Sequence, residues 1–358
     1  MLARLYAIAF EITLAIKVCM GLAEAFVLPR LRLGEDDEGP AALVRRVAVY
    51  SGMALVGTLV GVLAARATLM PNLLDSPRVA LLFALYFLLF LGLGLAVTLG
   101  TMLWKRLEER VRADQELRLA RRIQSSFLPV EFAMPPAYDL HAVNVPSRAV
   151  SGDFYDVVPA GDGALLIAIA DVSGKGIPAA LLGAMLQAAL RVQASTTASV
   201  AAILAAINRL LLHQQAVGRF ATFFLARLDP ARRRLVYSNA GHNPPLLLRS
   251  GGAVDALTEG GTVVGILPGP CWREAAVDLH VGDRLVLYTD GITEAAGPGG
   301  ELFGDERLRG VLGGLPPGLA SREVAAHVLA AVDAFTGGAE PDDDRTLMVV
   351  RVVGEPAA

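Results

Sequence analysis

Acidic residues stand beside apolar runs at several places in the second half of the chain. They are Asp153 with Asp156, Asp171, Asp290, and the triplet Asp342-Asp343-Asp344. Asp171 directly follows the apolar run 165–170, and Asp290 follows the run 284–289. A further run, 345–350, begins just after the triplet. Short runs of this composition predict buried strands, so each carboxylate is expected where a strand reaches the protein surface.

Strand ends that converge would bring these carboxylates into one site. Carboxylates close together repel one another unless a cation neutralises them, and ligand sets made only of oxygen suit Mg²⁺ or Mn²⁺ rather than Zn²⁺. A pair of such ions binds a phosphate group and lowers the pKa of a water that attacks phosphorus. One strand ending in Asp-Gly is more often an ordinary turn, but four such stretches together predict a two-metal phosphoester hydrolase.

The elements that must position this site occupy only part of the chain. Its 358 residues allow about two domains. The hydrophobic share of 54% is concentrated before residue 105, which indicates a membrane segment. A net charge of −3 without a long basic block excludes nucleic-acid binding. Cys19 and Cys271 are too few and too far apart for a disulfide framework or a thiolate metal site.

Residues 1–104 are expected to form an α-helical transmembrane block of two or three helices. Val47–Ala65 and Val79–Trp104 contain no charged residue, and each is near or above the roughly 20 residues that cross a bilayer. Basic residues flank the outer ends of these two spans. The positive-inside rule therefore predicts a multi-pass protein of the inner (cytoplasmic) membrane with its C-terminal domain in the cytoplasm.

The stretch Leu5–Leu28 leaves three alternatives. It is apolar but interrupted by Glu11, Lys17 and Glu24, which are costly inside a bilayer unless they face other helices or water. The stretch is therefore expected to be a third span, an interfacial amphipathic helix or a signal peptide. The charged residues themselves indicate either helix-pairing contacts or a ligand-sensing site.

Residues 105–128 are expected to form a linker helix that continues out of the membrane. They are rich in Arg, Glu, Gln and Leu, with no Gly or Pro. Their apolar residues recur at a loosely heptad-like spacing, which fits either a parallel coiled coil in a homodimer or a single amphipathic helix lying on the next domain.

Residues 129–353 are expected to form one domain of α/β or α+β class, followed by a short tail, 354–358. Short apolar runs there are separated by Gly, Pro and Asp, and two amphipathic helices are expected near Ile177–Gln193 and Ser199–Gln215.

Six sequence blocks in this domain occur in an order that resembles one protein family. After a leading stretch, Ala120–Pro129, they are Ser151–Asp156, Asp171–Ala180, Phe220–Phe224, Asn239–Pro245, Gly282–Glu294 and Asp343–Thr346. Over about residues 121–353 the chain resembles the bacterial PPM (PP2C-like) serine phosphatases of the sporulation stage II E and RsbU type. The resemblance implies a PP2C-like α-β-β-α sandwich with two Mn²⁺ or Mg²⁺ ions at one end.

Site roles follow from the resemblance, position by position. The expected metal ligands are Asp153, Asp171, Asp290, Asp343 and the carbonyl of Val172. Replacing Asp171 or Asp290 is expected to abolish turnover. Asp156 is expected to be a further ligand or to support one, and Asp344 to lie beside the ligands or contact phosphate.

The general acid has no assignment from the sequence. Eukaryotic relatives use an arginine and a histidine beside the second metal motif, whereas this chain offers Ser173 and Lys175 there. Lys175 is expected either to contact phosphate or to be a solvated turn residue. His242 is a candidate acid, but a histidine that stabilises its own turn is the more common role at such a position.

The resemblance implies a phosphorylated protein substrate, a phosphoserine or phosphothreonine on a STAS-domain anti-sigma-factor antagonist. The competing hypothesis is a catalytically inactive membrane signalling receptor that uses the phosphatase-like domain only for docking. The presence of all four candidate metal aspartates favours the enzyme.

Overall fold

The computed structural model describes residues 2–27, 40–68, 77–129, 131–213 and 218–354. The chain divides into two compact units, residues 1–114 and 115–358. One helix, α4 (Pro77–Phe127), begins in the first unit and ends in the second. The segment 105–128, where a linker helix is expected, thus forms the last part of a longer helix that ends at Phe127.

The first unit contains α1 (Leu2–Leu22), which continues as the π-helical turn η1 (Ala23–Val27), and α3 (Pro40–Thr68). By length and composition two stretches could cross a membrane, Tyr6–Val27 and Arg46–Thr68. They coincide with the expected spans at 5–28 and 47–65. The expected span Val79–Trp104 lies within α4, where most side chains from 78 to 98 lie outside the described part of the structure.

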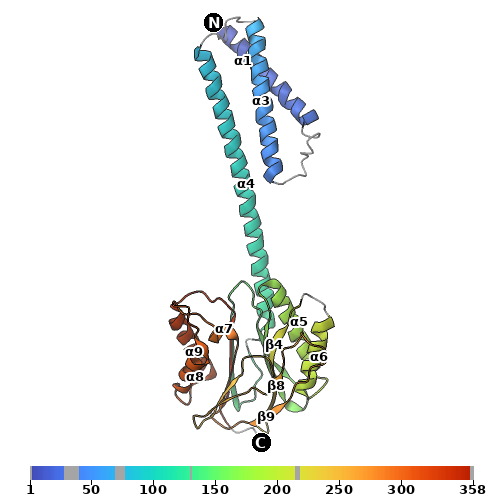
Figure 1. The fold of residues 1–358 in the computed structure, drawn as a ribbon, viewed down its shortest axis with the longest axis vertical. Helices are drawn as coiled ribbons and strands as arrows, with labels where there is room; N and C mark the ends of the chain where they lie inside the picture. Colours follow the sequence, from blue (N-terminus) through green and yellow to red (C-terminus); the bar gives the residue numbers. More distant parts are fainter. Residues whose placement is uncertain (1, 28–39, 69–76, 130, 214–217, 355–358) are drawn as a thin grey trace. The chain divides into compact units, whose positions relative to one another are not determined.

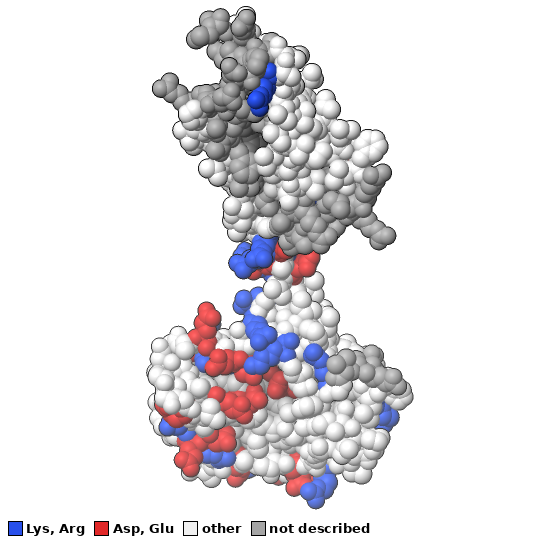
Figure 2. All heavy atoms as spheres, turned by 45° about the horizontal axis from the view of Figure 1, so that its top comes forward, with Lys and Arg blue, Asp and Glu red and all other residues white. Residues whose placement is uncertain are grey.

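Two glycines bring α1 and α3 into close contact. A Cβ at Gly57 would lie 2.6 Å from the Cα of Ile16, and one at Gly61 would lie 2.5 Å from the Cα of Ile12. This is the small-xxx-small spacing by which helices pair in membranes. Among the described residues of this unit that are visible in Figure 2, few are charged.

Two of the charged residues in the expected first span contact α3. Thr68 donates a hydrogen bond of 3.2 Å from its hydroxyl to Glu11, and Tyr50 donates one of 3.4 Å to Glu24. These charged residues were expected either to pair helices or to form a ligand-sensing site. The two hydrogen bonds to α3 favour helix pairing.

The second unit is an α-β-β-α sandwich, as the sequence predicted (Figure 1). Its five-stranded sheet has the order β1-β11-β10-β6-β7, and its six-stranded sheet contains β2-β3-β4-β5-β8, with β9 also paired to β5. The strands of the first sheet are β1 (Tyr138–Val145), β6 (Leu246–Leu248), β7 (Val254–Ala256), β10 (Arg284–Tyr288) and β11 (Arg345–Val352). Those of the second are β2 (Phe154–Pro159), β3 (Leu165–Val172), β4 (Ala221–Asp229), β5 (Arg234–Ala240), β8 (Gly260–Gly261) and β9 (Ala275–Asp278).

Helices cover both outer faces of the sandwich. The six-stranded sheet packs against α5 (Ile177–Gln193) and α6 (Val200–His213), and the five-stranded sheet packs against α8 (Gly304–Gly313) and α9 (Ser321–Thr336). A third apolar cluster fills the space between the sheets. The 3₁₀ turn η3 (Gly161–Gly163) joins β2 to β3, and the short helix α7 (Asp290–Thr293) follows β10.

The core follows from the side-chain alternation of the strands. Along β3, Leu166, Ala168 and Ala170 face the α5 side, while Leu165, Ile167 and Ile169 face the other sheet. Because both faces of this strand are covered, its sequence is a continuous apolar run rather than an alternating one. Such a strand meets solvent only at its ends, and Asp171 lies at the end that leads into α5.

Candidate metal centre

The four predicted metal aspartates come from two strand pairs, one in each sheet. Asp153 precedes β2 and Asp171 lies near the end of β3, and these strands pair antiparallel. Asp290 begins α7 just after β10, and Asp343 precedes β11, which is the antiparallel partner of β10. The two sheets therefore present all four carboxylates at the same end of the sandwich.

Asp153 is held from the opposite sheet. Its side chain is buried, and its Oδ2 atom accepts hydrogen bonds from the hydroxyls of Thr289 (2.7 Å) and Thr346 (2.6 Å). Thr289 follows β10 and Thr346 is the second residue of β11. The two hydroxyls fix the carboxylate in one orientation and leave its other oxygen for a further partner.

The carboxylates perturb one another. Burial and the nearby charge of Asp171 raise the pKa of Asp153 well above its usual range. Burial, then Asp290 and Asp343, raise the pKa of Asp171 to about 7, although a side-chain hydrogen bond with Asp153 lowers it. The pKa of Asp290 is raised by burial and then by Glu294 and Asp343. Each of these three aspartates thus has at least one of the other predicted ligands among the causes of its raised pKa, as expected for carboxylates gathered at one end of the sandwich.

A cationic side chain already contacts this site. The Nζ atom of Lys175 lies 2.9 Å from Oδ2 of Asp343 and donates a hydrogen bond of 2.7 Å to the carbonyl oxygen of Asp342. The Lys175 charge also lowers the pKa of Asp290. An ammonium group drawn into a set of carboxylates marks the place where positive charge is most strongly favoured.

The residues present fit divalent hard cations. The donors are all oxygen, and a cation would relieve the repulsion that raises their pKa values. Among the described residues, no group of three or more His, Cys, Asp or Glu side chains is arranged closely enough to hold a metal ion. The carboxylates are therefore gathered in one region without a preformed cage.

Glycines keep the backbone near these carboxylates tightly packed. A Cβ at Gly152 would lie 3.0 Å from the carbonyl oxygen of Val172, the predicted backbone ligand. A Cβ at Gly291 would collide with the carbonyl oxygen of Asp344. Side chains at these positions would push apart the strand ends that carry the four aspartates.

Asp344 fixes the loop before Asp153. Its Oδ1 atom accepts hydrogen bonds from the backbone N–H (2.7 Å) and the hydroxyl (3.0 Å) of Ser147, and its Oδ2 atom accepts one from the N–H of Gly152 (2.7 Å). These bonds join the start of β11 to the loop that positions the first metal aspartate. Asp344 therefore lies beside the carboxylate set, as the sequence allowed, with both of its oxygens occupied.

Asp156 lies apart from the other carboxylates. Its oxygens accept hydrogen bonds from Nε (2.7 Å) and NH2 (3.1 Å) of Arg191 and from Nε2 of Gln187 (3.1 Å), all on α5. Asp156 was expected either to be a further metal ligand or to support one. This geometry does not favour the ligand role. Its carboxylate anchors α5 on β2 because Arg191 and Gln187 occupy both of its oxygens.

His242 belongs to a buried turn. Its Nδ1 atom lies 2.8 Å from the Thr222 hydroxyl, and its backbone N–H donates a hydrogen bond of 2.7 Å to Asn239. Burial lowers the pKa of His242 to about 4, so the ring is neutral at pH 7. The ring stabilises the connection between β5 and β6, and it does not line the cavity beside the carboxylates.

A polar cavity of about 130 Å³ opens beside Asp343. Lys175, Glu294 and Arg345 contribute to its wall together with Asp342. Figure 2 shows acidic side chains gathered on one face of this unit. A cavity of this size has room for a phosphate group and its surrounding waters.

Three residues that support this site had no role predicted from the sequence. Thr289 and Thr346 stand next to predicted ligands, so their position beside motif aspartates was the available signal. Gln124 is the third. Its Nε2 donates to the Ser151 carbonyl (2.5 Å) and its Oε1 accepts from the Ser151 N–H (2.9 Å), which attaches the end of α4 to the loop before Asp153.

Comparisons with known proteins agree with this geometry. Residues 161–353, more than half of the chain, match the family described as stage II sporulation protein E (SpoIIE). The chain is 32% identical over 180 residues to phosphoserine phosphatase RsbU of Bacillus subtilis, covering 50% of this chain and 53% of that protein. It is 32% identical over 220 residues to protein IcfG of Synechocystis, covering 54% of this chain and 35% of that protein.

A solved structure shares the sandwich. The SiaA-PP2C domain of Pseudomonas aeruginosa superposes with a TM-score of 0.61 at 25% identity, over 68% of this chain and 98% of that domain. The residues that match the family lie in the second unit. The chain spans about half or less of the length of RsbU and IcfG.

Proposed function

This chain belongs to the stage II sporulation protein E family, and we propose that its second unit is a metal-dependent protein serine/threonine phosphatase. The observation that carries the proposal is the meeting of Asp153, Asp171, Asp290 and Asp343 from both sheets at one end of the sandwich. RsbU, named a phosphoserine phosphatase, supports the same chemistry.

The proposed site binds two Mn²⁺ or Mg²⁺ ions. Asp153, Asp171, Asp290, Asp343 and the Val172 carbonyl would hold them, and the ions when bound would polarise the phosphate and supply a water of lowered pKa. Thr289 and Thr346 orient Asp153 through their hydrogen bonds, which favour its ionised form against the burial that raises its pKa. Lys175 would move from Asp343 toward the phosphate group once other positive charge occupies the site.

Hydrolysis of p-nitrophenyl phosphate by the purified full-length chain in detergent tests this proposal. We expect turnover that requires Mn²⁺ and that Asp171→Asn or Asp290→Asn reduces by more than about a thousandfold, because each removes a charge the ions need. Asp278→Asn, an exposed aspartate on β9, is the matched control and should retain full activity. A metal-loaded wild type without turnover would support the inactive docking receptor instead.

The substrate is proposed to be a phosphorylated protein, a phosphoserine or phosphothreonine on a STAS-domain anti-sigma-factor antagonist. The name of the relative RsbU, a phosphoserine phosphatase, supports phosphoserine as the group that is hydrolysed. Mapping of phosphosites in cells that lack the gene tests it. A STAS-domain phosphosite that accumulates there, and that the purified enzyme dephosphorylates, is the expected result.

The first unit is proposed to anchor the enzyme in the inner membrane, with the catalytic unit in the cytoplasm. Support comes from the two apolar helical stretches, the close pairing of α1 with α3 through Gly57 and Gly61, and the basic residues that follow Trp104. Protease accessibility of the catalytic unit in intact spheroplasts and in inverted vesicles tests the orientation.

The end of α4 is proposed to transmit a signal to the metal centre, alone or within a coiled-coil homodimer. It contacts the loop before Asp153 through Gln124, and α5 through a hydrogen bond of 2.9 Å from Gln187 to the Phe127 carbonyl. A flexible Gly-Ser insertion between Glu108 and Glu109 should uncouple the two units. Unchanged basal and stimulated activity after that insertion would refute mechanical coupling.

A further inference from the structure

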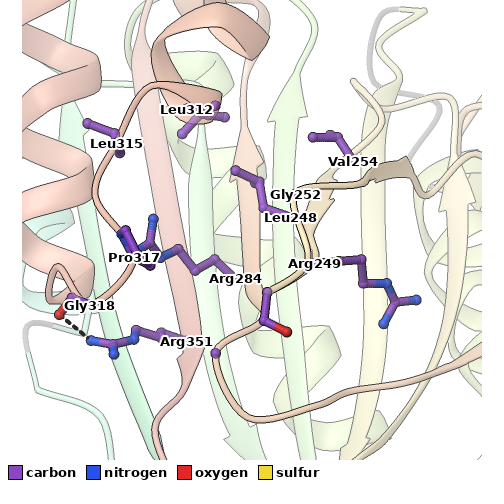
Figure 3. Close-up of a pocket in the computed structure, with 13 residues that line it drawn as sticks. Leu248, Arg249, Gly252, Val254, Arg284, Leu312, Leu315, Pro317, Gly318 and Arg351 are labelled. Carbon is purple, nitrogen blue, oxygen red and sulfur yellow. Dashed lines mark hydrogen bonds between the residues drawn. The ribbon is translucent and has the colours of Figure 1, made fainter.

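A second cavity lies at the opposite end of the five-stranded sheet from the metal centre. Its volume is about 410 Å³, and its wall includes the start of β10, the end of β11 and the loop between α8 and α9 (Figure 3). Apolar side chains from Leu248, Leu312 and Leu315 form part of this wall. Three arginines line it: Arg284 and Arg351, which lie beside the loop, and Arg249, which is already paired with acidic residues.

Arg284 is buried without a carboxylate partner. It is the first residue of β10, and its side chain and backbone together are only 7% exposed. One NH2 hydrogen bond of 2.6 Å goes to the Pro316 carbonyl, while the buried Nε atom has no acceptor. Burial, and then the nearby charge of Arg351, lower the pKa of Arg284.

Arg351 lies directly opposite Arg284 in the pairing of β10 with β11, so both side chains leave the sheet on the same face. Its NH1 group donates to the carbonyl oxygens of Gly318 (2.7 Å) and Leu319 (3.0 Å). Its Nε atom is also buried without an acceptor. Two guanidinium groups thus share one cavity, and each has an unused donor.

The carboxylates near this cavity are engaged elsewhere. Asp283 forms an ion pair with Arg249, whose other partner is Asp255. Asp139 lies opposite Arg351 in β1, and its Oδ2 atom accepts the backbone N–H of Ser321. In the described ranges no ion pair joins either Arg284 or Arg351 to an acidic residue. Buried charges without a counterion are costly, so an anion from outside the chain would be strongly favoured here.

We propose that this cavity binds a small organic phosphate. A phosphate dianion placed between Arg284 and Arg351 would neutralise both charges and accept hydrogen bonds from both guanidinium groups, whereas a single carboxylate would neutralise only one of the two charges. The organic part of the ligand would lie against Leu248, Leu312 and Leu315. A cavity of about 410 Å³ has room for a molecule larger than phosphate alone.

Titration with phenyl phosphate in EDTA tests this site by itself. Without divalent ions the four carboxylates of the metal centre repel a phosphate dianion, and hydrolysis does not compete. The full-length chain in detergent should bind phenyl phosphate at one saturable site by calorimetry, and inorganic phosphate more weakly because it lacks the apolar part. Phenol, which lacks the anion, should not bind.

Arg284→Met and Arg351→Met should each weaken phenyl phosphate binding by about tenfold or more, because each removes a charge-assisted hydrogen bond. Arg234→Met, at an exposed ion pair on β5, is the matched control and should bind like the wild type. If circular dichroism shows that a Met variant is unfolded, Arg284→Lys and Arg351→Lys replace it, and they should also bind more weakly because lysine lacks the forked donors of a guanidinium group.

Either of two results would overturn the proposal. One is the absence of saturable phenyl phosphate binding to the folded wild type. The other is an unchanged affinity in folded variants at Arg284 and Arg351. Neither result bears on the phosphatase assignment, which is measured with Mn²⁺ and depends on other residues.

Discussion

Thr346 on β11 donates a hydrogen bond of 2.6 Å to Oδ2 of Asp153, which directly precedes β2 in the other sheet. Asn144 on β1 extends this contact, because its Nδ2 donates to the Thr346 hydroxyl (2.7 Å) and to the Ser151 hydroxyl (3.0 Å). The first metal aspartate is thus positioned by the opposite sheet, so the packing of the two sheets and the geometry of the metal centre depend on each other.

Replacing Thr346 with Val should weaken metal binding. A hydrogen bond to a charged group contributes about 1.5–3 kcal/mol, so the Mn²⁺ concentration for half-maximal activity should rise about tenfold or more. Activity at saturating Mn²⁺ should change much less. The measurement is a Mn²⁺ titration of p-nitrophenyl phosphate hydrolysis with Thr346→Ser, which keeps the hydroxyl, as control. Equal Mn²⁺ requirements in the Val variant and the wild type would contradict this role.

Asp171→Asn should stabilise the metal-free protein while removing its response to metal. Burial, and then repulsion from Asp290 and Asp343, raises the folded-state pKa of Asp171 to about 7, so its ionisation at neutral pH opposes folding. Removing the charge should add about 1–3 kcal/mol of stability, or a few degrees in Tm for a unit of this size. Thermal unfolding in EDTA and then in Mn²⁺ measures both effects. A lower Tm for the variant in EDTA would show that repulsion in this site is unimportant.

His242 should make the fold sensitive to acid. Its pKa is about 4 in the folded protein against an ordinary 6.5, so below pH 6.5 the unfolded chain binds a proton that the folded one does not. The contribution of His242 to the free energy of unfolding is therefore fully present above pH 6.5, and it decreases as the pH falls toward 4. Between pH 7 and pH 5 the loss should be about 2 kcal/mol.

Urea unfolding of residues 115–358 in EDTA at pH 7 and pH 5 measures this loss. Between pH 7 and pH 5, Asp171 changes the free energy of unfolding in the opposite direction to His242. The pH-dependent loss of stability is therefore compared between the wild type and His242→Gln. The variant should lose about 2 kcal/mol less on acidification. A wild type and variant with the same pH dependence would indicate that His242 already carries a proton in the fold.

The strand ends that carry the site could be predicted because they depend on local sequence. The expected strand at 165–170 is β3, the one at 284–289 is β10, and the one at 345–350 is β11. A continuous apolar run that stops at an aspartate defines both the strand and its end without reference to the rest of the chain.

The contacts that orient the site could not be predicted in the same way. Asp156 looks like a metal ligand in its motif, yet it pairs with Arg191, 35 residues later and on another element. The Thr346 hydroxyl reaches Asp153 across 193 residues. The local sequence does not distinguish these hydrogen-bond partners from solvated side chains. Which side chains meet is determined by the packing of the two sheets and α5.

Gln124→Ala should impair the metal centre although Gln124 is no ligand. Both atoms of its amide hydrogen-bond the Ser151 backbone, two residues before Asp153, so its loss frees the loop that carries the first metal aspartate. Stability should fall by only about 1–2 kcal/mol, the usual effect of losing two partly exposed hydrogen bonds. The Mn²⁺ concentration for half-maximal activity should rise several-fold more than that of Gln115→Ala, an exposed residue of the same helix. A Gln124→Ala protein with a lower Tm but the wild-type Mn²⁺ requirement would show that α4 merely packs on the catalytic unit and does not position Asp153.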